Sequence, residues 1–452
     1  MTRHATLAID RTPATAHTLD AWAGSYTVDA RPHIVAWNLT RRCNLACAHC
    51  YISAGAWHDS ADELTTVEVH RITDEILDLN PAPLFILSGG EPLLRDDLEE
   101  IAAHAVSGGA TVVVGTNGTR LTAARIASLK EAGVSGVAIS IDSLDPQYHD
   151  RFRHGDGALA DTLAAVARLR EQRLDFIVQT TVTRGNRAEL PAVAAWAAVR
   201  GAVAFNVYFL VETGRGEGMH GLEPAENEAV LTELIALERE YRGRMMVRSK
   251  CQPQIMRHVL AAEDDSPLRN YATRCPCGVQ YCRITPDGKL TPCPYLPEVA
   301  GDLRTQSFAD VWAGAPLLRA LREREPGGKC GDCEYRRVCG GCRARAFART
   351  GDVLGPDESC AYEPDGTVPV VEPAARVSYG ADVVASLPWD DEARTRMSRV
   401  PSFVRGVVTA RIEAFARERG RDRVTAELLA EVRNSMPLDF SKRRPFFLED
   451  DA

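Results

Sequence analysis

Three cysteines, Cys43, Cys47 and Cys50, stand at the spacing Cys-x3-Cys-x2-Cys directly after an apolar stretch at 33–39. Three thiolates on one short loop can hold three irons of a four-iron, four-sulfur (4Fe-4S) cluster. No fourth cysteine stands close by in the sequence, so one iron would keep an open position. An open iron can bind a substrate or a cofactor, which the fully ligated cluster of an electron carrier cannot do.

A second set of cysteines lies in the later half of the chain. Closely spaced groups of this kind are typical of metal ligands, and the members are Cys275, Cys277, Cys282, Cys293, Cys330, Cys333, Cys339, Cys342 and Cys360. Two kinds of site fit the spacing: iron–sulfur clusters, or zinc held by Cys-x2-Cys pairs. Disulfides are less favoured, because no secretion signal is visible. We expect Cys251, which stands apart, to be a buried free thiol.

The composition is that of an ordinary globular protein of two to four domains, with 45% hydrophobic and 25% charged residues in 452. The net charge of −9 gives no reason to expect a nucleic-acid partner. No apolar run approaches the roughly 18 residues of a membrane span. We therefore expect a cytoplasmic protein without a membrane partner, whose 13 cysteines ligate metal in a reducing environment.

Short β-branched runs alternate with helical patterns from residue 33 to residue 211. The pattern predicts strands at 33–39, 83–94, 111–119, 134–142, 175–183 and 203–211, and helices at 65–79, 96–106, 123–132, 159–172 and 189–199. Six such strands imply a parallel sheet with right-handed crossovers, and their nearly continuous apolar character fits burial on both faces. We predict an α/β fold, a partial (β/α)6 barrel of the TIM type. A doubly wound sheet is the competing topology.

Small and polar residues follow these strands at the edge of the sheet where the first cysteine loop also lies. They are Gly89, Gly90 and Glu91 after the second strand, Thr116 and Asn117 at the third, Ser140 and Asp142 at the fourth and Gln179 on the fifth. Glycines let a backbone approach a ligand closely, and residues two apart on a strand share one face. Capping of strand ends is the alternative interpretation for Thr116 or Asp142 taken alone.

Taken in this order, the cysteine triplet and the strand-end residues resemble the radical S-adenosylmethionine (SAM) superfamily over residues 33–215. The resemblance implies that the open iron binds SAM, that one electron from the cluster cleaves SAM, and that the resulting 5′-deoxyadenosyl radical removes hydrogen from a substrate. It further implies that the Gly89–Glu91 loop binds the SAM amino group and that Ser140 and Asp142 bind its ribose or carboxylate. Thr116, Asn117 and Gln179 are expected to line the same site. No residue is predicted as a general acid or base, and we interpret His49 as shielding for the cluster.

Residues 275–362 resemble the SPASM extension of radical SAM enzymes, with Gly288 four residues before Cys293. This resemblance implies two auxiliary iron–sulfur clusters. By position, one would be held by Cys330, Cys333, Cys339 and Cys360. The other would be held by Cys293, Cys342 and two of Cys275, Cys277 and Cys282, and the sequence does not choose between those three. One departure from the pattern is the two-residue spacing between Cys339 and Cys342.

The end of the chain, at 388–432, resembles the small helical domain of light-independent protochlorophyllide reductase subunits. Seven arginines stand against three acids between Arg399 and Arg423, beside Trp389, Phe403 and Phe415. Aromatic rings and arginine forks suit a flat ligand that carries carboxylates. A solvated helical face that packs on the main body is the alternative.

These assignments predict a chain of several domains. They are an N-terminal lead-in (1–30), a radical SAM core (31–220), a helical bridge with an acidic helix at 225–241 (221–274), a SPASM domain (275–365), a linker (366–387) and a small helical domain (388–440).

The runs at 37–55 and 209–216 are similar to radical SAM enzymes that modify tetrapyrrole side chains in heme d1 and alternative heme biosynthesis. This likeness implies hydrogen abstraction from a propionate or acetate group, with flavodoxin or ferredoxin as the reductant. The alternative is a maturase that modifies a small ribosomally made peptide, although only 32 residues precede the first expected strand, few for a peptide-recognition domain. A non-catalytic iron–sulfur carrier or scaffold is a third possibility, which the open iron position argues against.

Overall fold

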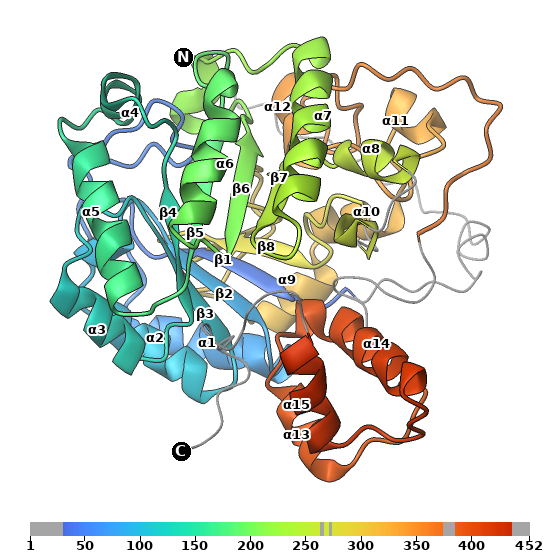
Figure 1. Cartoon of the computed structure of the whole chain (residues 1–452). Coiled ribbons are helices and arrows are strands. Elements are labelled where there is room, and N and C mark those ends of the chain that lie inside the picture. Colours follow the sequence, from blue (N-terminus) through green and yellow to red (C-terminus); the bar gives the residue numbers. More distant parts are fainter. Residues whose placement is uncertain (1–29, 263–265, 271–273, 374–384, 436–452) are drawn as a thin grey trace.

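The structure is a computed structural model, and it describes residues 30–262, 266–270, 274–373 and 385–435 (Figure 1). The predicted lead-in up to residue 29, part of the predicted linker and the last residues of the predicted helical domain lie outside these ranges. Among the described residues, the search for a helix with the length and apolarity of a membrane span found none.

The six predicted strands are present and pair in parallel in chain order. They are β1 (Ile34–Asn38), β2 (Leu84–Ser88), β3 (Thr111–Thr116), β4 (Gly136–Ser140), β5 (Phe176–Val182) and β6 (Ala204–Phe209). The predicted α/β fold with a parallel sheet is therefore confirmed, as is a helical region at the C-terminus.

The sheet is longer than predicted at both edges. β7 (Met246–Lys250) pairs in parallel with β6, and β8 (Tyr281–Ile284) pairs in parallel with β1. The short antiparallel strands β9 (Lys289–Thr291) and β10 (Gly301–Asp302) follow β8. The sheet order is β10-β9-β8-β1-β2-β3-β4-β5-β6-β7, so the predicted bridge and SPASM regions each contribute strands to the same sheet as the core.

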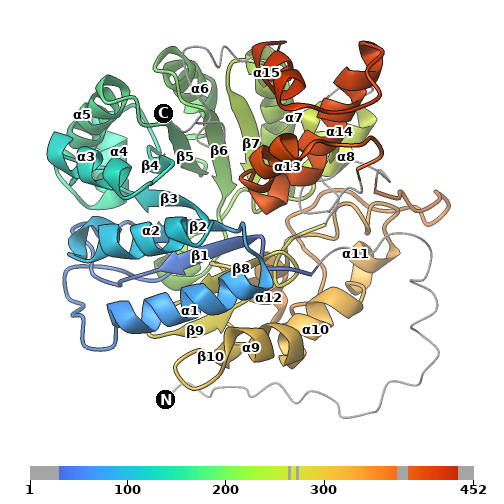
Figure 2. The same cartoon turned by 90° about the horizontal axis from the view of Figure 1, so that it is seen from below.

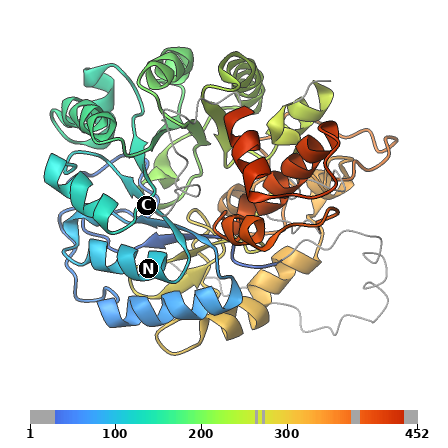
Figure 3. The same cartoon turned by 60° about the horizontal axis from the view of Figure 1, so that its bottom comes forward.

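Helices line the outer face of this sheet (Figure 3). Those predicted are α1 (Thr66–Leu79), α2 (Leu98–Ser107), α3 (Ala123–Glu131), α5 (Ala158–Glu171), α6 (Leu190–Val199) and α7 (Pro224–Tyr241), and α4 (Pro146–Arg153) was not predicted. Thr65 and Glu68 form a capping box that fixes the start of α1. The Cys-rich part adds α8 (Ile255–Ala261), α9 (Phe308–Gly314), α10 (Pro316–Glu323), α11 (Gly328–Asp332) and α12 (Arg343–Thr350).

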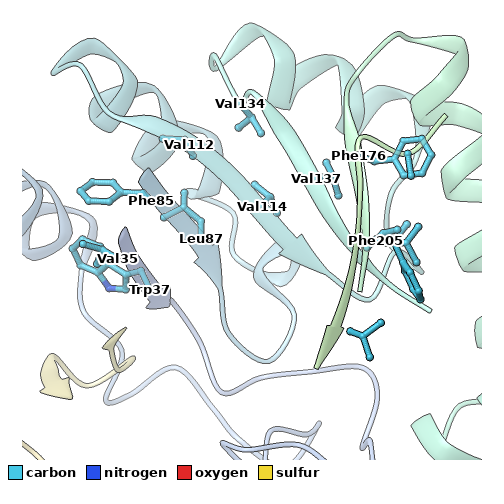
Figure 4. Packing of buried hydrophobic residues seen from close by; sticks show 14 of the residues in the cluster. Val35, Trp37, Phe85, Leu87, Val112, Val114, Val134, Val137, Phe176 and Phe205 are labelled. Atoms are coloured by element: carbon cyan, nitrogen blue, oxygen red, sulfur yellow. The ribbon is translucent and has the colours of Figure 1, made fainter. Parts of the chain in front are cut away.

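Alternate residues of each strand pack into one hydrophobic core between the sheet and the helices (Figure 4). On β1 these residues are Val35 and Trp37, and on β2 they are Phe85 and Leu87, all at most 1% exposed. Because successive side chains of a strand point to opposite faces, the residues between them face the inner side of the curved sheet. This inner side is where strand-end residues of different strands can meet a common ligand.

The C-terminal helices α13 (Asp391–Ser398), α14 (Ser402–Glu418) and α15 (Ala426–Ser435) form a separate unit with its own apolar core (Figure 2). The unit docks through Ser402, whose Oγ lies 2.8 Å from His33 Nδ1 and 2.9 Å from Asn80 Nδ2. The Ser402 amide also donates to the Ala82 carbonyl at 2.9 Å. His33 directly precedes β1 and Ala82 stands two residues before β2, so the arginine-rich helices lie at the opposite end of the strands from the first cysteine loop.

Candidate functional site

The loop after β1 gathers Cys43, Cys47 and Cys50 into one cluster of side chains. The Leu45 amide points at Cys43 Sγ at 3.4 Å, and the Ala54 amide points at Cys50 Sγ at 3.3 Å. Burial raises the pKa of Cys43 to about 12 and also raises the pKa of Cys47. Amides that point at sulfur stabilise thiolates, and a bound metal deprotonates a thiol outright. The loop therefore fits a metal cluster better than a free nucleophile.

Two arginines that the sequence analysis did not single out hold this loop. Arg153 donates to Asp142 Oδ2 through Nε (2.8 Å) and Nη2 (2.6 Å), and its Nη1 lies 3.7 Å from Cys47 Sγ. Arg215 donates to the carbonyls of Cys47 (2.8 Å) and Ala54 (2.6 Å). Arg153 lies on the unpredicted α4, and Arg215 lies in a glycine-rich break, so neither belonged to a recognisable pattern.

The glycine-rich loop after β2 packs directly on the cysteine loop. The Gly90 amide donates to the Thr40 carbonyl at 2.7 Å, and the Glu91 amide donates to the Arg42 carbonyl at 2.9 Å. A Cβ atom on Gly90 would lie 2.2 Å from the Arg42 carbonyl oxygen, too close for any side chain. The close approach that the glycines were predicted to allow is thus, in part, an approach to the cysteine loop itself.

Glu91 is buried and its carboxylate is occupied within the protein. It accepts hydrogen bonds from Leu93 N (3.1 Å), Thr116 Oγ1 (2.7 Å) and Asn117 N (2.9 Å). Burial raises the pKa of this carboxyl group, although the three donors favour its charged form. Asn117 in turn donates to Asn44 Oδ1 at 3.1 Å in the cysteine loop. The side chains of Glu91 and Thr116 therefore fix the loop at Asn117, which in turn contacts the cysteine loop.

The predicted residues on β4 and β5, and Asp142 just after β4, fall into two groups. The Asp142 carboxylate is buried and bound by Arg153 and by the Thr181 amide at 2.8 Å. Ser140 and Gln179 are register partners on neighbouring strands and are only half-buried. Gln179 Nε2 donates to the hydroxyl of Tyr208 at 3.2 Å. Ser140 and Gln179 are therefore the members of the predicted set that can still meet a ligand through their side chains.

The structure brings together four cysteines of the SPASM region and leaves one aside. Cys275 contacts Cys277 and Cys342, and Cys277 contacts Cys293. Cys282 instead lies on β8, opposite Val35 of β1, and is fully buried in the apolar core. Of the three candidates that the sequence left open, Cys275 and Cys277 therefore lie with Cys293 and Cys342.

A second group of four cysteines, Cys330, Cys333, Cys339 and Cys360, lines one pocket. Asp357 links the two groups, because its Oδ2 accepts the Cys342 amide at 2.8 Å and its own amide points at Cys330 Sγ at 3.3 Å. Among the described residues, no three His, Cys, Asp or Glu side chains are spaced to hold a single metal ion.

Tyrosine rings lie between the first cysteine loop and the Cys275 group. The ring of Tyr295 is 5.0 Å from that of Tyr51 and 6.4 Å from that of Tyr208, centre to centre. Tyr51 directly follows Cys50, and its hydroxyl accepts a hydrogen bond from Asn38 at 2.7 Å. All three rings are half-buried, so they offer aromatic surface on the inner side of the sheet. Their wide separation in the sequence hid this cluster from sequence analysis.

Comparison with known families agrees with the predicted resemblances. The radical SAM superfamily matches residues 37–197, an iron–sulfur cluster-binding (SPASM) domain matches 275–342, and the proto-chlorophyllide reductase 57 kD subunit family matches 389–433. An AdoMet-dependent heme synthase of Methanosarcina barkeri is 39% identical over 74% of this chain and 97% of its own length. The chain belongs to the radical SAM superfamily.

Other similar proteins include enzymes with different names. A pre-heme d1 synthase of Dinoroseobacter shibae is 33% identical over 72% of this chain and 85% of its own length. A mycofactocin maturase of Mycobacterium ulcerans is 32% identical over 73% of this chain and 88% of its own length. The SAM-bound structure of Streptococcus suis SuiB, at 15% identity, shares the fold with a TM-score of 0.61 over 74% of this chain and 78% of that one. This radical SAM protein is an enzyme that uses SAM, a SAM-binding 4Fe-4S cluster and auxiliary iron–sulfur clusters.

Proposed function

We propose that this radical SAM enzyme acts on a tetrapyrrole that carries carboxylate side chains and removes hydrogen from one of those side chains. The observation that carries the proposal is the half-buried ring set of Tyr51, Tyr208 and Tyr295 beside the first cysteine loop. Half-buried aromatic surface of this kind suits contact with a flat macrocycle. The names of the heme synthase and pre-heme d1 synthase relatives support the same substrate class.

The proposal assigns the cysteines to three clusters. Cys43, Cys47 and Cys50 hold the SAM-binding cluster. One auxiliary cluster is held by Cys275, Cys277, Cys293 and Cys342, and the other by Cys330, Cys333, Cys339 and Cys360. The contacts among these thiols and the pocket that encloses the last four support this division. Cys251 and Cys282 remain free thiols.

SAM contacts are assigned to residues that can still reach a ligand. Ser140 and Gln179 offer half-buried polar side chains on neighbouring strands, and the Gly89–Gly90 backbone stands beside the cysteine loop. Glu91, Thr116 and Asp142 act as positioning residues, because their side chains are bound within the protein. The cluster held by Cys43, Cys47 and Cys50 would supply the electron for reductive cleavage of SAM, and SAM would supply the group that abstracts hydrogen from the substrate.

The test is an anaerobic titration of the reconstituted enzyme with iron-coproporphyrin, with flavodoxin or ferredoxin as the proposed electron donor. We expect a shift of the porphyrin Soret band and faster formation of 5′-deoxyadenosine. A Cys43→Ala variant, which removes one ligand of the SAM-binding cluster, controls for 5′-deoxyadenosine from other sources. No response to any tetrapyrrole would contradict the proposal, and a yield no higher than that of the variant would favour a non-catalytic scaffold.

A peptide substrate is the second candidate, since the mycofactocin maturase relative is nearly as similar as the pre-heme d1 synthase. The two functions separate in one experiment, in which the enzyme receives a tetrapyrrole or a small peptide encoded beside its gene. Mass change in the peptide alone would favour the maturase.

A further inference from the structure

Three cationic side chains face the inner side of the sheet on its two outermost long strands. On β7, Val247 packs into the core with the helices, so its neighbours Arg248 and the next inward residue, Lys250, point to the opposite face. On β8, Cys282 and Ile284 pack into the same core, which turns Arg283 inward. The first cysteine loop and the tyrosine rings lie on this same side.

Within the described residues, none of these three cations forms an ion pair with a carboxylate. Arg248 Nη2 contacts Met246 Sδ at 2.7 Å, and the charged or titratable neighbours of Lys250 are Arg248 and the thiol of Cys251. Arg283 is 6% exposed, donates Nη1 to the Pro294 carbonyl at 2.8 Å, and leaves its buried Nε without a partner.

Of the four other buried arginines among the described residues, three have a carboxylate partner, and the fourth, Arg343, donates to backbone carbonyls. Arg95 pairs with Asp97 at 2.6 Å, Arg153 pairs with Asp142 at 2.6 Å, and Arg345 pairs with Asp357 at 3.2 Å. Burying a cation without a counter-charge is costly. Arg248, Lys250 and Arg283 lack a carboxylate partner in the described part of the chain, so the carboxylates of an anionic ligand would supply their missing counter-charges.

The cations flank the tyrosine rings. Lys250 is the register partner of Tyr208 on β6, and Arg248 lies close enough to Tyr208 to act on its hydroxyl electrostatically. Arg283 lies near Tyr51 and Tyr281 on the other side. Aromatic faces between cationic groups match a flat ring with carboxylates at its edge.

We propose that Arg248, Lys250 and Arg283 bind the carboxylates of the substrate and thereby determine its specificity, an inference that rests on the tetrapyrrole function proposed above. From the sequence, this combination of rings and cations was expected in the C-terminal helices. Arg411 there is exposed on α14, in the unit that docks at the opposite end of the strands.

The experiment measures equilibrium binding of two porphyrins to the reconstituted holoenzyme without reductant. The probes are iron-coproporphyrin III, a tetracarboxylic acid, and iron mesoporphyrin, a dicarboxylic acid. For Lys250→Met and Arg248→Met we expect roughly ten- to hundredfold weaker binding of the tetracarboxylic probe and a smaller loss for the dicarboxylic one. Lys250→Arg, which keeps the charge, should retain most of the affinity, and Arg411→Met should bind like the unchanged protein.

Iron content of each variant, matched to the unchanged protein, shows that the fold and clusters are intact. If the unchanged protein binds both porphyrins and the two methionine variants bind them equally well, the cation assignment is wrong while the tetrapyrrole function stands. Equal losses for both probes, or a loss in Arg411→Met, would also overturn the assignment. If the unchanged protein binds neither porphyrin, the proposed function itself fails, and the cation assignment fails with it.

Discussion

Arg153 joins Asp142 to Cys47, with its Nη2 2.6 Å from Asp142 Oδ2 and its Nη1 3.7 Å from Cys47 Sγ. Both charged side chains are buried. The pair balances its own charges inside the protein, and it leaves one nitrogen of the Arg153 guanidinium beside a sulfur that we assign to the SAM-binding cluster. Charge and hydrogen bonds at the sulfur set the potential of iron–sulfur clusters, so Arg153 should make this cluster easier to reduce.

We predict that Arg153→Gln lowers the midpoint potential of the SAM-binding cluster, by roughly 60 mV for each 1.4 kcal/mol of lost stabilisation. It also leaves Asp142 without its counter-charge, which costs about 3–5 kcal/mol of stability. Potentiometric titration followed by electron paramagnetic resonance measures the first effect, and thermal unfolding measures the second. Arg151→Gln is the matched control, because Arg151 lies on the same helix and is exposed, with its guanidinium 5.8 Å from the centre of the Tyr148 ring. Equal potentials in the two variants would refute the role of Arg153.

The division of the cysteines predicts different iron contents for two neighbouring substitutions. Cys277→Ala should remove one auxiliary cluster and lower the content from about 12 to about 8 irons per chain. Cys282→Ala should keep about 12 irons and cost only about 1 kcal/mol, because it removes a small buried side chain from the core. Iron and sulfide analysis of anaerobically reconstituted protein provides the measurement. Iron loss in Cys282→Ala would show that the assignment is inverted.

Much of the fold could be predicted because the six core strands are apolar runs bounded by turns, and the matching helices carry clear periodicity. β7 and β8 escaped prediction because charged residues interrupt them. Their inward positions carry Arg248, Lys250 and Arg283, so neither strand has the continuous apolar character of the others. α4 was missed because its sequence is almost entirely polar, with only His149, Phe152 and Arg153 buried.

The candidate site was predictable where ligand spacing is local and hidden where contacts are distant in sequence. The triplet at Cys43 and the pocket group at Cys330 follow from short spacing. The choice of Cys277 over Cys282 depended on which face of β8 meets the core. Asp142 was predicted as a site residue, whereas its partner Arg153 became visible only in the structure, where α4 packs beside it. Likewise, we expected aromatic and cationic groups together in the C-terminal helices, and a similar combination lies on the inner side of the sheet.

Ser402 joins the C-terminal helices to the main body through hydrogen bonds. Ser402→Ala removes its hydroxyl bonds with His33 and Asn80, and losing buried hydrogen bonds costs about 1–3 kcal/mol. Hydrogen exchange of the Ser402 amide should therefore accelerate by roughly tenfold or more, while SAM cleavage without substrate should not change. Ser398→Ala is the control, since the Ser398 hydroxyl is exposed and bonds only to Thr395 of its own helix. Unchanged exchange in Ser402→Ala would mean that other contacts hold the unit.

The affinity for a tetracarboxylic porphyrin should depend on pH through Lys250. Burial, together with the nearby Arg248, lowers the pKa of the Lys250 ammonium to about 8. A neutral amine cannot pair with a carboxylate, so affinity should stay level below this pKa and fall as pH rises through it. Burial raises the pKa of the neighbouring Cys251 thiol and Tyr208 hydroxyl, so both stay neutral over this range. Binding titrations between about pH 6.5 and pH 9 measure the effect. Lys250→Arg should remove the fall, because a guanidinium keeps its proton throughout; a fall of the same size in that variant would assign the titration to another group.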